Sequence, residues 1–221
     1  MISNRKILHS SFVRYGALPL GLIVLVVVLR LFFFLPFRVM TSAQAPSLRL
    51  GAWALARRSH SPKHGDIVLF RMTSPRGHTD TSLHLGRIVA LPGDSIELRS
   101  GKLFINEEEV RDYRQQTNPA ESYALRLPRE GGVYPITSTN LVAYRSALLQ
   151  ESKLYLSAPD EVALEGTDPK HWLKALAKNP YHTFRRDYYW VLTDQTQAAP
   201  DSRHLGILPA DAIEGIVLFG L

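Results

Sequence analysis

Ser42 and His84 form a pair whose residue types could support nucleophilic catalysis. A serine hydroxyl attacks a carbonyl only when a nearby base takes its proton, and histidine can supply that base. Equally, His84 could be an ordinary exposed residue of a strand. The chain contains no cysteine, which excludes disulfides and any cysteine-ligated metal. We expect neither a metal nor a cofactor.

A long apolar segment precedes these residues. Residues 16–37 read GALPLGLIVLVVVLRLFFFLPF and contain a single charge, Arg30. As a helix they would span about 30 Å, the thickness of the hydrocarbon core of a membrane. Residues 1–15 include basic side chains and no acidic one, so the positive-inside tendency places them in the cytoplasm. The sequence therefore predicts a single-pass transmembrane helix in the cell membrane, with a cytoplasmic tail and an exported body.

The apolar segment has two alternative interpretations. Ala43-Gln44-Ala45 resembles an A-x-A cleavage site, as in a signal peptide that is removed. However, the apolar region exceeds the usual length of about 7–15 residues, and its second half is bulky and aromatic. A buried core helix is a further alternative, although a globular core seldom needs so long an apolar element. We expect a retained anchor.

The net charge of +6 says little about partners. Four of these six charges come from Arg5, Lys6, Arg14 and Arg30, so the remaining chain carries about two. No concentrated basic face is visible, and we expect no nucleic-acid partner. The expected partners are membrane lipid and other polypeptides.

Beyond the anchor, the apolar pattern changes to alternation, which is typical of strands. Short turns such as Pro92-Gly93-Asp94 and Ser100-Gly101 separate the strands. No long helices alternate with them, so the pattern predicts a mainly β fold with antiparallel sheets. The predicted strands are residues 47–56, 67–71, 84–91, 95–99, 102–106, 188–192 and 212–219.

Residues 110–186 differ in character from the segments on either side. They are rich in proline, glycine and charge, and contain two candidate helices, residues 138–151 and 170–178. We interpret them as an inserted α+β subdomain within a β domain formed by residues 38–109 and 187–221.

Four groups of residues, in order, match a known family. They are residues 30–39 (RLFFFLPFRV); 45–51 (APSLRLG) with 65–70 (GDIVLF); 87–97 (RIVALPGDSIE) with 101–106 (GKLFIN); and 188–194 (YYWVLTD) with 201–203 (DSR) and 206–209 (GILP). On these motifs the chain resembles the type I signal peptidases of the S26 family, which share a LexA/signal-peptidase-like fold. These membrane-anchored serine proteases remove signal peptides from exported proteins.

The resemblance implies that the reactive groups are missing. The family uses a serine nucleophile and a lysine base, and burial must lower the pKa of that lysine from about 10.4 toward neutrality. The nucleophile position corresponds to Ala43, the base position to Gly86, and the position of the base-orienting hydroxyl to Ala199. None of these side chains can perform its role. Ser42 and His84 are the fallback candidates for a relocated dyad.

The resemblance also implies that the frame around the site is retained. Thr41 occupies an oxyanion-donor position, and Arg87 with Asp194 matches a structural ion pair beside the site. Ala52 and Thr193 depart from the family pattern, where an acid and a glycine are usual. Further supporting residues are Asp201, Ser202 and Arg203, and the implied peptide-binding residues are Val39, Met40, Leu48 and Ile88.

These residues favour a non-catalytic homologue that binds exported precursor polypeptides. Homologues without the dyad occur in Gram-positive pilus loci. The resemblance therefore also implies that the protein assists sortase-dependent pilus assembly, with pilin and sortase as partners. The competing hypothesis is an active signal peptidase that uses Ser42 and His84. A structural membrane protein without a peptide groove is the third alternative.

Overall fold

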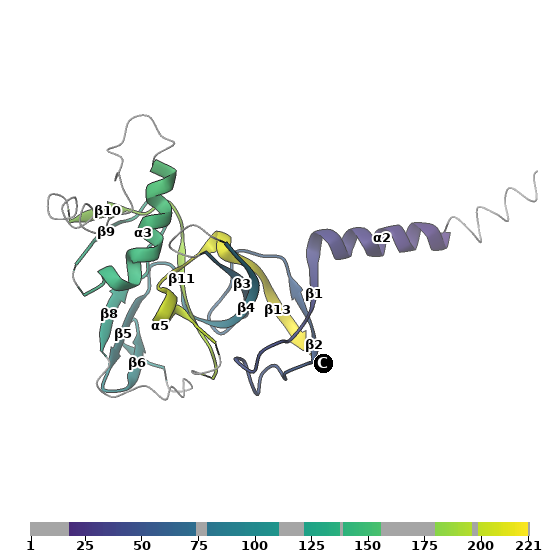
Figure 1. Cartoon of the computed structure of the whole chain (residues 1–221), viewed down its shortest axis with the longest axis horizontal. Helices are drawn as coiled ribbons and strands as arrows, with labels where there is room; N and C mark the ends of the chain where they lie inside the picture. The colour runs from purple at the N-terminus through teal and green to yellow at the C-terminus, as the bar shows by residue number, and fades with distance from the viewer. Residues whose placement is uncertain are drawn as a thin grey trace, which may run out of the picture.

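The protein was analysed as a computed structural model that describes residues 18–73, 79–110, 122–137, 139–155, 180–195 and 199–220. The predicted helix at residues 170–178 lies outside the described residues. Figure 1 shows a β-rich body with one helix, α2, extending from one end. The body is mainly β with antiparallel pairing throughout its sheets, as the sequence predicts.

Helix α2 spans Leu18–Phe33 and lies within the predicted apolar segment. The predicted helix extends to residue 37, but residues Phe34–Arg38 form strand β1 instead. Pro36 explains this difference, because proline lacks the N–H that a helix needs and disfavours helical backbone in the preceding residue. Among the described residues, no helix is both long and apolar enough to cross a membrane.

The larger sheet carries residues from each of the four motif groups. It has seven strands in the order β1-β2-β13-β3-β4-β11-β12. Strand β1 pairs with β2 from Phe34↔Arg57 to Arg38↔Trp53, so the chain turns back on itself across the loop between them. The other strands are β2 (Trp53–Arg57), β3 (Ile67–Thr73), β4 (Thr79–Ala90), β11 (Tyr188–Leu192), β12 (Leu208–Pro209) and β13 (Ile213–Gly220).

The smaller sheet and helix α3 lie at the end of the body away from α2 (Figure 1). The sheet has the order β7-β6-β5-β8, and a separate pair joins β10 to β9. The strands are β5 (Ser95–Arg99), β6 (Lys102–Ile105), β7 (Glu108–Glu109), β8 (Tyr123–Arg126), β9 (Val133–Pro135) and β10 (Tyr181–Thr183). The helical elements are α3 (Leu141–Tyr155), α5 (Ser202–Leu205) and the 3-10 turn η2 (Ala210–Ala212).

The predicted strand at residues 47–56 begins only at Trp53. Residues 42–47 are turns, and Gly51 has a φ of 83°, a left-handed conformation that glycine adopts without steric cost. The alternating pattern therefore reflects half-buried loop residues rather than a continuous strand. The predicted helix at residues 138–151 is present as α3, shifted toward the C-terminus.

Residues 110–186 are not a self-contained unit in the described part of the chain. Strand β8 pairs with β5 along its whole length, and Tyr144 of α3 packs in one core with Ile96 and Trp190. The segment thus completes the second sheet and shares its core with the flanking strands. The domain boundaries inferred from the sequence, including the one at residue 110, stay a prediction.

Candidate active site

The predicted nucleophile position, Ala43, lies in the loop between β1 and β2. Ala43 is fully buried, and its N–H donates to the Thr41 hydroxyl at 3.1 Å. Its carbonyl accepts a hydrogen bond from the Gln195 N–H at 2.9 Å. The loop is thus tied to the chain after β11, where the motif containing Asp194 lies. The arrangement presents a methyl group, which cannot attack a carbonyl.

Neighbouring side chains fill the space beside Gly86, the predicted base position. Gly86 lies on β4 opposite Val68, and a Cβ built there would lie 2.2 Å from Val191 Cγ1 and 3.2 Å from Phe70 Cε1. Contacts as short as the first do not occur between unbonded carbon atoms, and valine is too short and too stiff to move aside cheaply. Position 86 therefore lacks space for a lysine stem in this packing.

The fallback residues occupy different surroundings. Ser42 is partly buried beside Ala43, and its carbonyl accepts from the Ala45 N–H at 3.0 Å. His84 is partly buried, and its ring packs against Phe70 with centroids 5.8 Å apart. The side chain of Phe70 thus contacts His84 and also bounds the space at position 86. Ala199, the base-orienting position, is partly buried and offers only a methyl group.

Arg87 and Asp194 form a bidentate ion pair beside this loop. Arg87 Nε donates to Asp194 Oδ1 at 2.9 Å, and Arg87 Nη2 donates to Asp194 Oδ2 at 2.7 Å. Ser47 joins the pair, since its Oγ accepts from Arg87 at 2.8 Å and donates to Asp194 at 3.0 Å. Arg87 also donates to the Gly65 carbonyl at 2.8 Å. Strand β4 is thereby connected to three loops at once.

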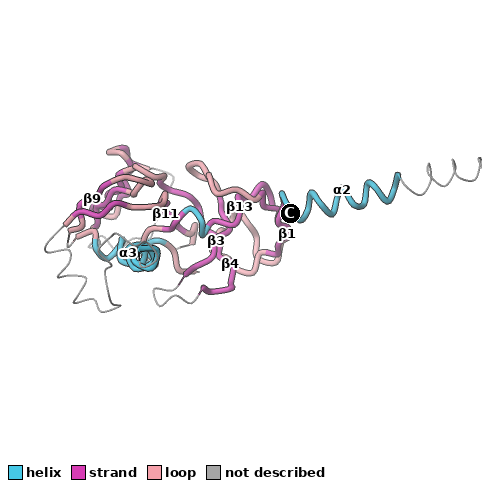
Figure 2. Tube along the Cα trace, turned by 90° about the horizontal axis from the view of Figure 1, so that it is seen from above, coloured by secondary structure: helices cyan, strands magenta, loops and turns pink. Residues whose placement is uncertain are grey.

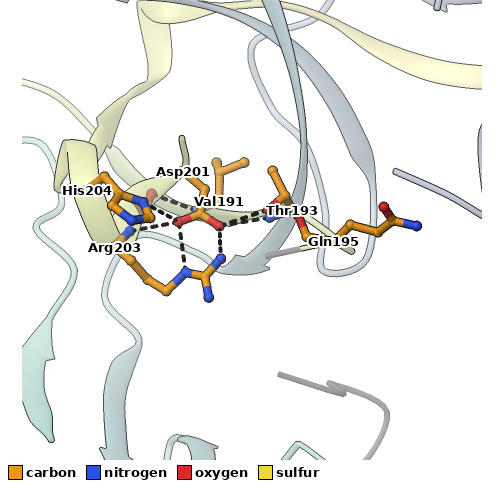
Figure 3. Close-up of polar contacts among 7 residues, drawn as sticks. Val191, Thr193, Gln195, Asp201, Arg203 and His204 are labelled. Atoms are coloured by element: carbon orange, nitrogen blue, oxygen red, sulfur yellow. Dashed lines mark hydrogen bonds and ion pairs between the residues drawn. The ribbon is translucent and has the colours of Figure 1, made fainter. Parts of the chain in front are cut away.

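A second charged cluster fixes the end of β11 (Figure 3). Asp201 is fully buried and accepts from Arg203 Nε at 2.9 Å and Nη2 at 2.6 Å, and from the Thr193 N–H at 3.1 Å. Burial alone would raise the pKa of Asp201, but the hydrogen bonds from Arg203 and Thr193 outweigh it and lower the pKa. Ser202 accepts from the Val191 N–H at 2.9 Å, which holds in place the valine that fills position 86.

The predicted peptide-binding residues do not share one surface. Val39 and Leu48 are buried in a cluster with Leu69 and Leu85, and Ile88 is 1% exposed. Val39 directly follows β1, and Leu48 lies in the loop between β1 and β2. Met40, in contrast, is 81% exposed just after β1. Ile88, on β4, also borders the cavity described below.

A cavity of about 890 Å³ opens beside the loop that contains Ala43. It is bounded on one side by the loop with Ala45, Pro46 and Ser47, and on another by Arg87 and Asp194. The sequence analysis did not predict it, since its far wall comes from the β6–β7 hairpin. The remaining lining residues are His64, Gly65, Ile88, Val89, Ile105, Asn106, Glu108, Glu109 and Val110.

Gln44 is a site residue that the sequence analysis missed. It is fully buried next to Ala43, and neither polar atom of its side-chain amide has a hydrogen-bond partner among the described residues. A buried amide without a partner costs free energy, so such a group requires a reason. In the sequence, Gln44 is marked only as a polar residue between two alanines. That pattern resembles an A-x-A cleavage site.

Together these features define a class: an antiparallel β scaffold with a buried loop after its first strand, two arginine–carboxylate pairs and a cavity beside that loop. The pattern of the family described as "Signal peptidase, peptidase S26" matches residues 12–221. This chain belongs to that family. The resemblance inferred from the four groups of motifs is therefore confirmed.

Individual relatives agree with this assignment. The chain is 26% identical over 131 residues to "Signal peptidase I P" of Bacillus subtilis subsp. natto, covering 58% of this chain and 68% of that protein. It is 27% identical over 165 residues to "Signal peptidase I" of Pseudomonas fluorescens, covering 67% of this chain and 54% of that protein. The crystal structure of a signal peptidase I from Enterococcus faecalis V583 matches at 21% identity and a TM-score of 0.35, covering 71% of this chain and 96% of that one.

Proposed function

We propose that this protein is a non-catalytic member of the signal peptidase family that binds exported precursor polypeptides without cleaving them. The packing at position 86 carries the proposal, because Val191 and Phe70 occupy the space into which a base would extend. Ala43 and Ala199 add that the nucleophile and the base-orienting hydroxyl are missing as well. Three reactive groups are thus absent, while the ion pairs around their positions are retained. This combination favours a binding role.

The retained framework supports binding rather than simple decay. The Arg87–Asp194 pair and the Asp201–Arg203 pair both keep bidentate geometry, and Thr41 keeps its hydroxyl two residues before Ala43. Bidentate arginine–carboxylate pairs fix orientation as well as contributing energy. These pairs fix the elements around the loop with Ala43, which lies beside the cavity. The site is therefore well defined in shape although it lacks a reactive group.

We further propose that α2 is part of the anchor that places this site at the membrane. Apart from Arg30, its sequence is apolar, and the described apolar side chains are exposed, with Leu20 and Leu22 each 62% exposed. A helix that is apolar all round needs either a protein core or lipid around it. Figure 2 shows α2 extending away from the body, so the body does not supply that core. On this proposal the chain is single-pass, with residues 1–15 in the cytoplasm and the body outside.

Precursor capture tests the binding role. The full chain in its native membrane would be crosslinked to a tagged exported precursor that still carries its signal sequence. We expect an uncleaved complex that Met40→Asp weakens, because Met40 is the exposed residue at the end of β1. Val142→Asp is the matched control, since Val142 is equally exposed but lies on α3. Failure to capture any precursor, or equal capture by both variants, would contradict the proposal.

The narrower assignment to pilus assembly rests on the resemblance to dyad-less homologues in pilus loci. It predicts that the crosslinked partners include a pilin precursor or a sortase. Mass spectrometry of the crosslinked proteins would identify them. If the crosslinked partners were exported proteins of many unrelated kinds, the pilus role would be excluded. The conclusion would then be restricted to general precursor binding. The competing enzyme hypothesis, with Ser42 and His84, requires cleavage of the precursor instead.

A further inference from the structure

The hairpin of β6 and β7 ends in a two-residue turn with unusual backbone angles. Asn106 and Glu107 have φ values of 50° and 70°, which are both in the left-handed region. Two successive left-handed residues define the type I′ turn that closes tight β-hairpins. The turn therefore fixes the register Ile105↔Glu108 and Phe104↔Glu109.

This register determines which backbone groups of β7 are free. Val110 donates its N–H to the Leu103 carbonyl at 2.9 Å, so these two residues form a hydrogen-bonded pair. Such pairs alternate with non-hydrogen-bonded pairs along an antiparallel ladder. Glu109, opposite Phe104, is thus in a non-hydrogen-bonded pair, and its N–H and C=O point away from β6. Since β7 is the edge strand of the sheet as described, these groups face no further strand of that sheet.

The open edge of β7 forms one wall of the cavity beside the loop with Ala43. Glu108, Glu109 and Val110 line the cavity together, and Ala45, Pro46 and Ser47 line its other side. An open strand edge is a template for an extended polypeptide, which pairs with it through main-chain hydrogen bonds. The cavity therefore offers room for an extended segment beside an edge that can hold it.

The charged side chains around the cavity determine which extended segments it favours. Two of the charged residues around the cavity are paired: Asp194 with Arg87 at 2.7 Å, and Glu109 with Lys102 at 3.1 Å. Glu108 also lines the cavity, and Glu107 precedes it in the chain. Both are exposed, and neither has an ion pair within the part of the chain that the structure describes. These two carboxylates favour a partner with positive charge.

We propose that this cavity binds an extended, basic segment of the exported polypeptide as an added strand on β7. The inference rests on the proposed function, which supplies the exported polypeptide as the occupant, and it adds the chemistry of the bound segment and its place. The lysine or arginine side chains of the segment lie near Glu107 and Glu108. Its main chain pairs with the N–H and C=O of Glu109.

Peptide binding to the full chain in non-ionic detergent tests this proposal. The probe is a fluorescein-labelled, end-capped octapeptide of alternating lysine and valine, and fluorescence anisotropy reports its binding. We expect Glu108→Lys to weaken binding about tenfold, because it reverses a charge at the rim of the cavity. Glu130→Lys, the matched control, reverses an exposed acidic residue that does not line the cavity and should leave binding unchanged.

A second probe tests the added strand. The same octapeptide with N-methyl groups on one edge cannot donate main-chain hydrogen bonds from that edge, and we expect it to bind at least about tenfold more weakly. Equal binding of the methylated probe, or equal effects of Glu108→Lys and Glu130→Lys, would overturn the proposal.

Precursor capture separates this inference from the proposed function. Capture of the precursor without binding of the octapeptide would overturn the inference alone and leave the proposed function standing. Octapeptide binding that depends on Glu108, without capture of any exported precursor, would instead overturn the proposed function and with it the assignment of the exported chain as occupant.

Discussion

Gly86 occupies the predicted position of the catalytic base, and neighbouring side chains fill the space beside it. A side chain at this position would point toward Val191 on β11 and Phe70 on β3, two residues of the core that β3, β4 and β11 share. A base at position 86 would therefore require different packing. Replacing Gly86 alone would not supply such a base, because its neighbours would have to move as well.

Gly86→Ala is predicted to lower the free energy of unfolding by about 1–3 kcal/mol, the usual cost of overpacking a core. The added methyl group would lie 2.2 Å from Val191 Cγ1 before any relaxation. Urea unfolding of the wild type, Gly86→Ala, Val191→Ala and the double variant measures the coupling. We expect the double variant to be more stable than the sum of the single effects predicts. Strict additivity would show that the two positions do not compete for space.

Asp201 gives a prediction that depends on pH. Its pKa is lowered from the ordinary value of 3.8, so its ionised form stabilises the fold above that value. This stabilisation is lost as the pH falls through the lowered folded-state pKa. Asp201→Asn should cost about 3–5 kcal/mol near pH 7, because it leaves Arg203 without its buried partner, and that cost should shrink in acid below about pH 4.

The control for this measurement is Asp211→Asn, because the carboxylate of Asp211 is 59% exposed in its pair with Arg186. An exposed pair contributes at most about 1 kcal/mol, so this variant should unfold nearly as the wild type does. Denaturant unfolding at pH 7 and pH 3 compares the two. An equal effect of both variants at pH 7 would refute the structural role given to Asp201.

At the scale of elements, the local apolar pattern predicted several strands correctly. It failed where a strand forms through contacts with residues far away in the sequence. The strands at residues 67–71, 95–99 and 188–192 lie where they were predicted. Residues 95–99 alternate in burial, as in a strand with one buried face, whereas residues 188–192 form a short apolar run that is buried throughout. Strand β1 was missed, since its aromatic residues continue the apolar run of α2. Its pairing with β2 is a tertiary contact that no local window contains.

The candidate site likewise has features that the sequence predicts and features that depend on tertiary contacts. The resemblance to the family assigns the missing groups to Ala43, Gly86 and Ala199, and this assignment stays a prediction. The packing of Val191 against position 86 could not be predicted from the sequence, since it depends on how β4 and β11 pair. The cavity was equally hidden, because it lies between the loop with Ser47 and the β6–β7 hairpin.

The β6–β7 hairpin allows a direct test of its turn. Glu107 has a φ of 70°, a conformation that costs a residue with a side chain about 1 kcal/mol relative to glycine. Glu107→Gly, which creates the preferred Asn-Gly turn, should raise the free energy of unfolding by up to about 1 kcal/mol. Glu97→Gly, in the middle of β5, is the matched control and should lower it by about 0.5–1 kcal/mol. Destabilisation by both changes would contradict the I′ turn.

At the scale of the whole molecule, α2 and β1 determine where the site lies. Strand β1 starts directly after α2, and the loop with Ala43 follows β1 (Figure 1). If α2 lies in lipid, the site and its cavity are held near the membrane surface. A polypeptide that emerges from the bilayer would then meet this site first.

Charges placed in α2 test the anchor. Val24→Lys combined with Val27→Lys should move the protein from the carbonate-resistant membrane fraction to the released fraction, because each lysine opposes insertion by about 2.5–3.5 kcal/mol. Val133→Lys with Val142→Lys, at exposed positions of the body, is the matched control and should stay in the membrane. Fractionation followed by immunoblotting measures both. Retention of the α2 variant would contradict the proposed anchor.

The most direct test of the central claim is a search for the cleavage product. An exported precursor is incubated with an equimolar amount of the full chain, and intact-mass spectrometry follows it over hours, with an active signal peptidase as positive control. The account predicts that the precursor stays intact with the wild type and with Ser42→Ala alike. A product cut after the signal sequence that disappears in Ser42→Ala or His84→Ala would contradict it.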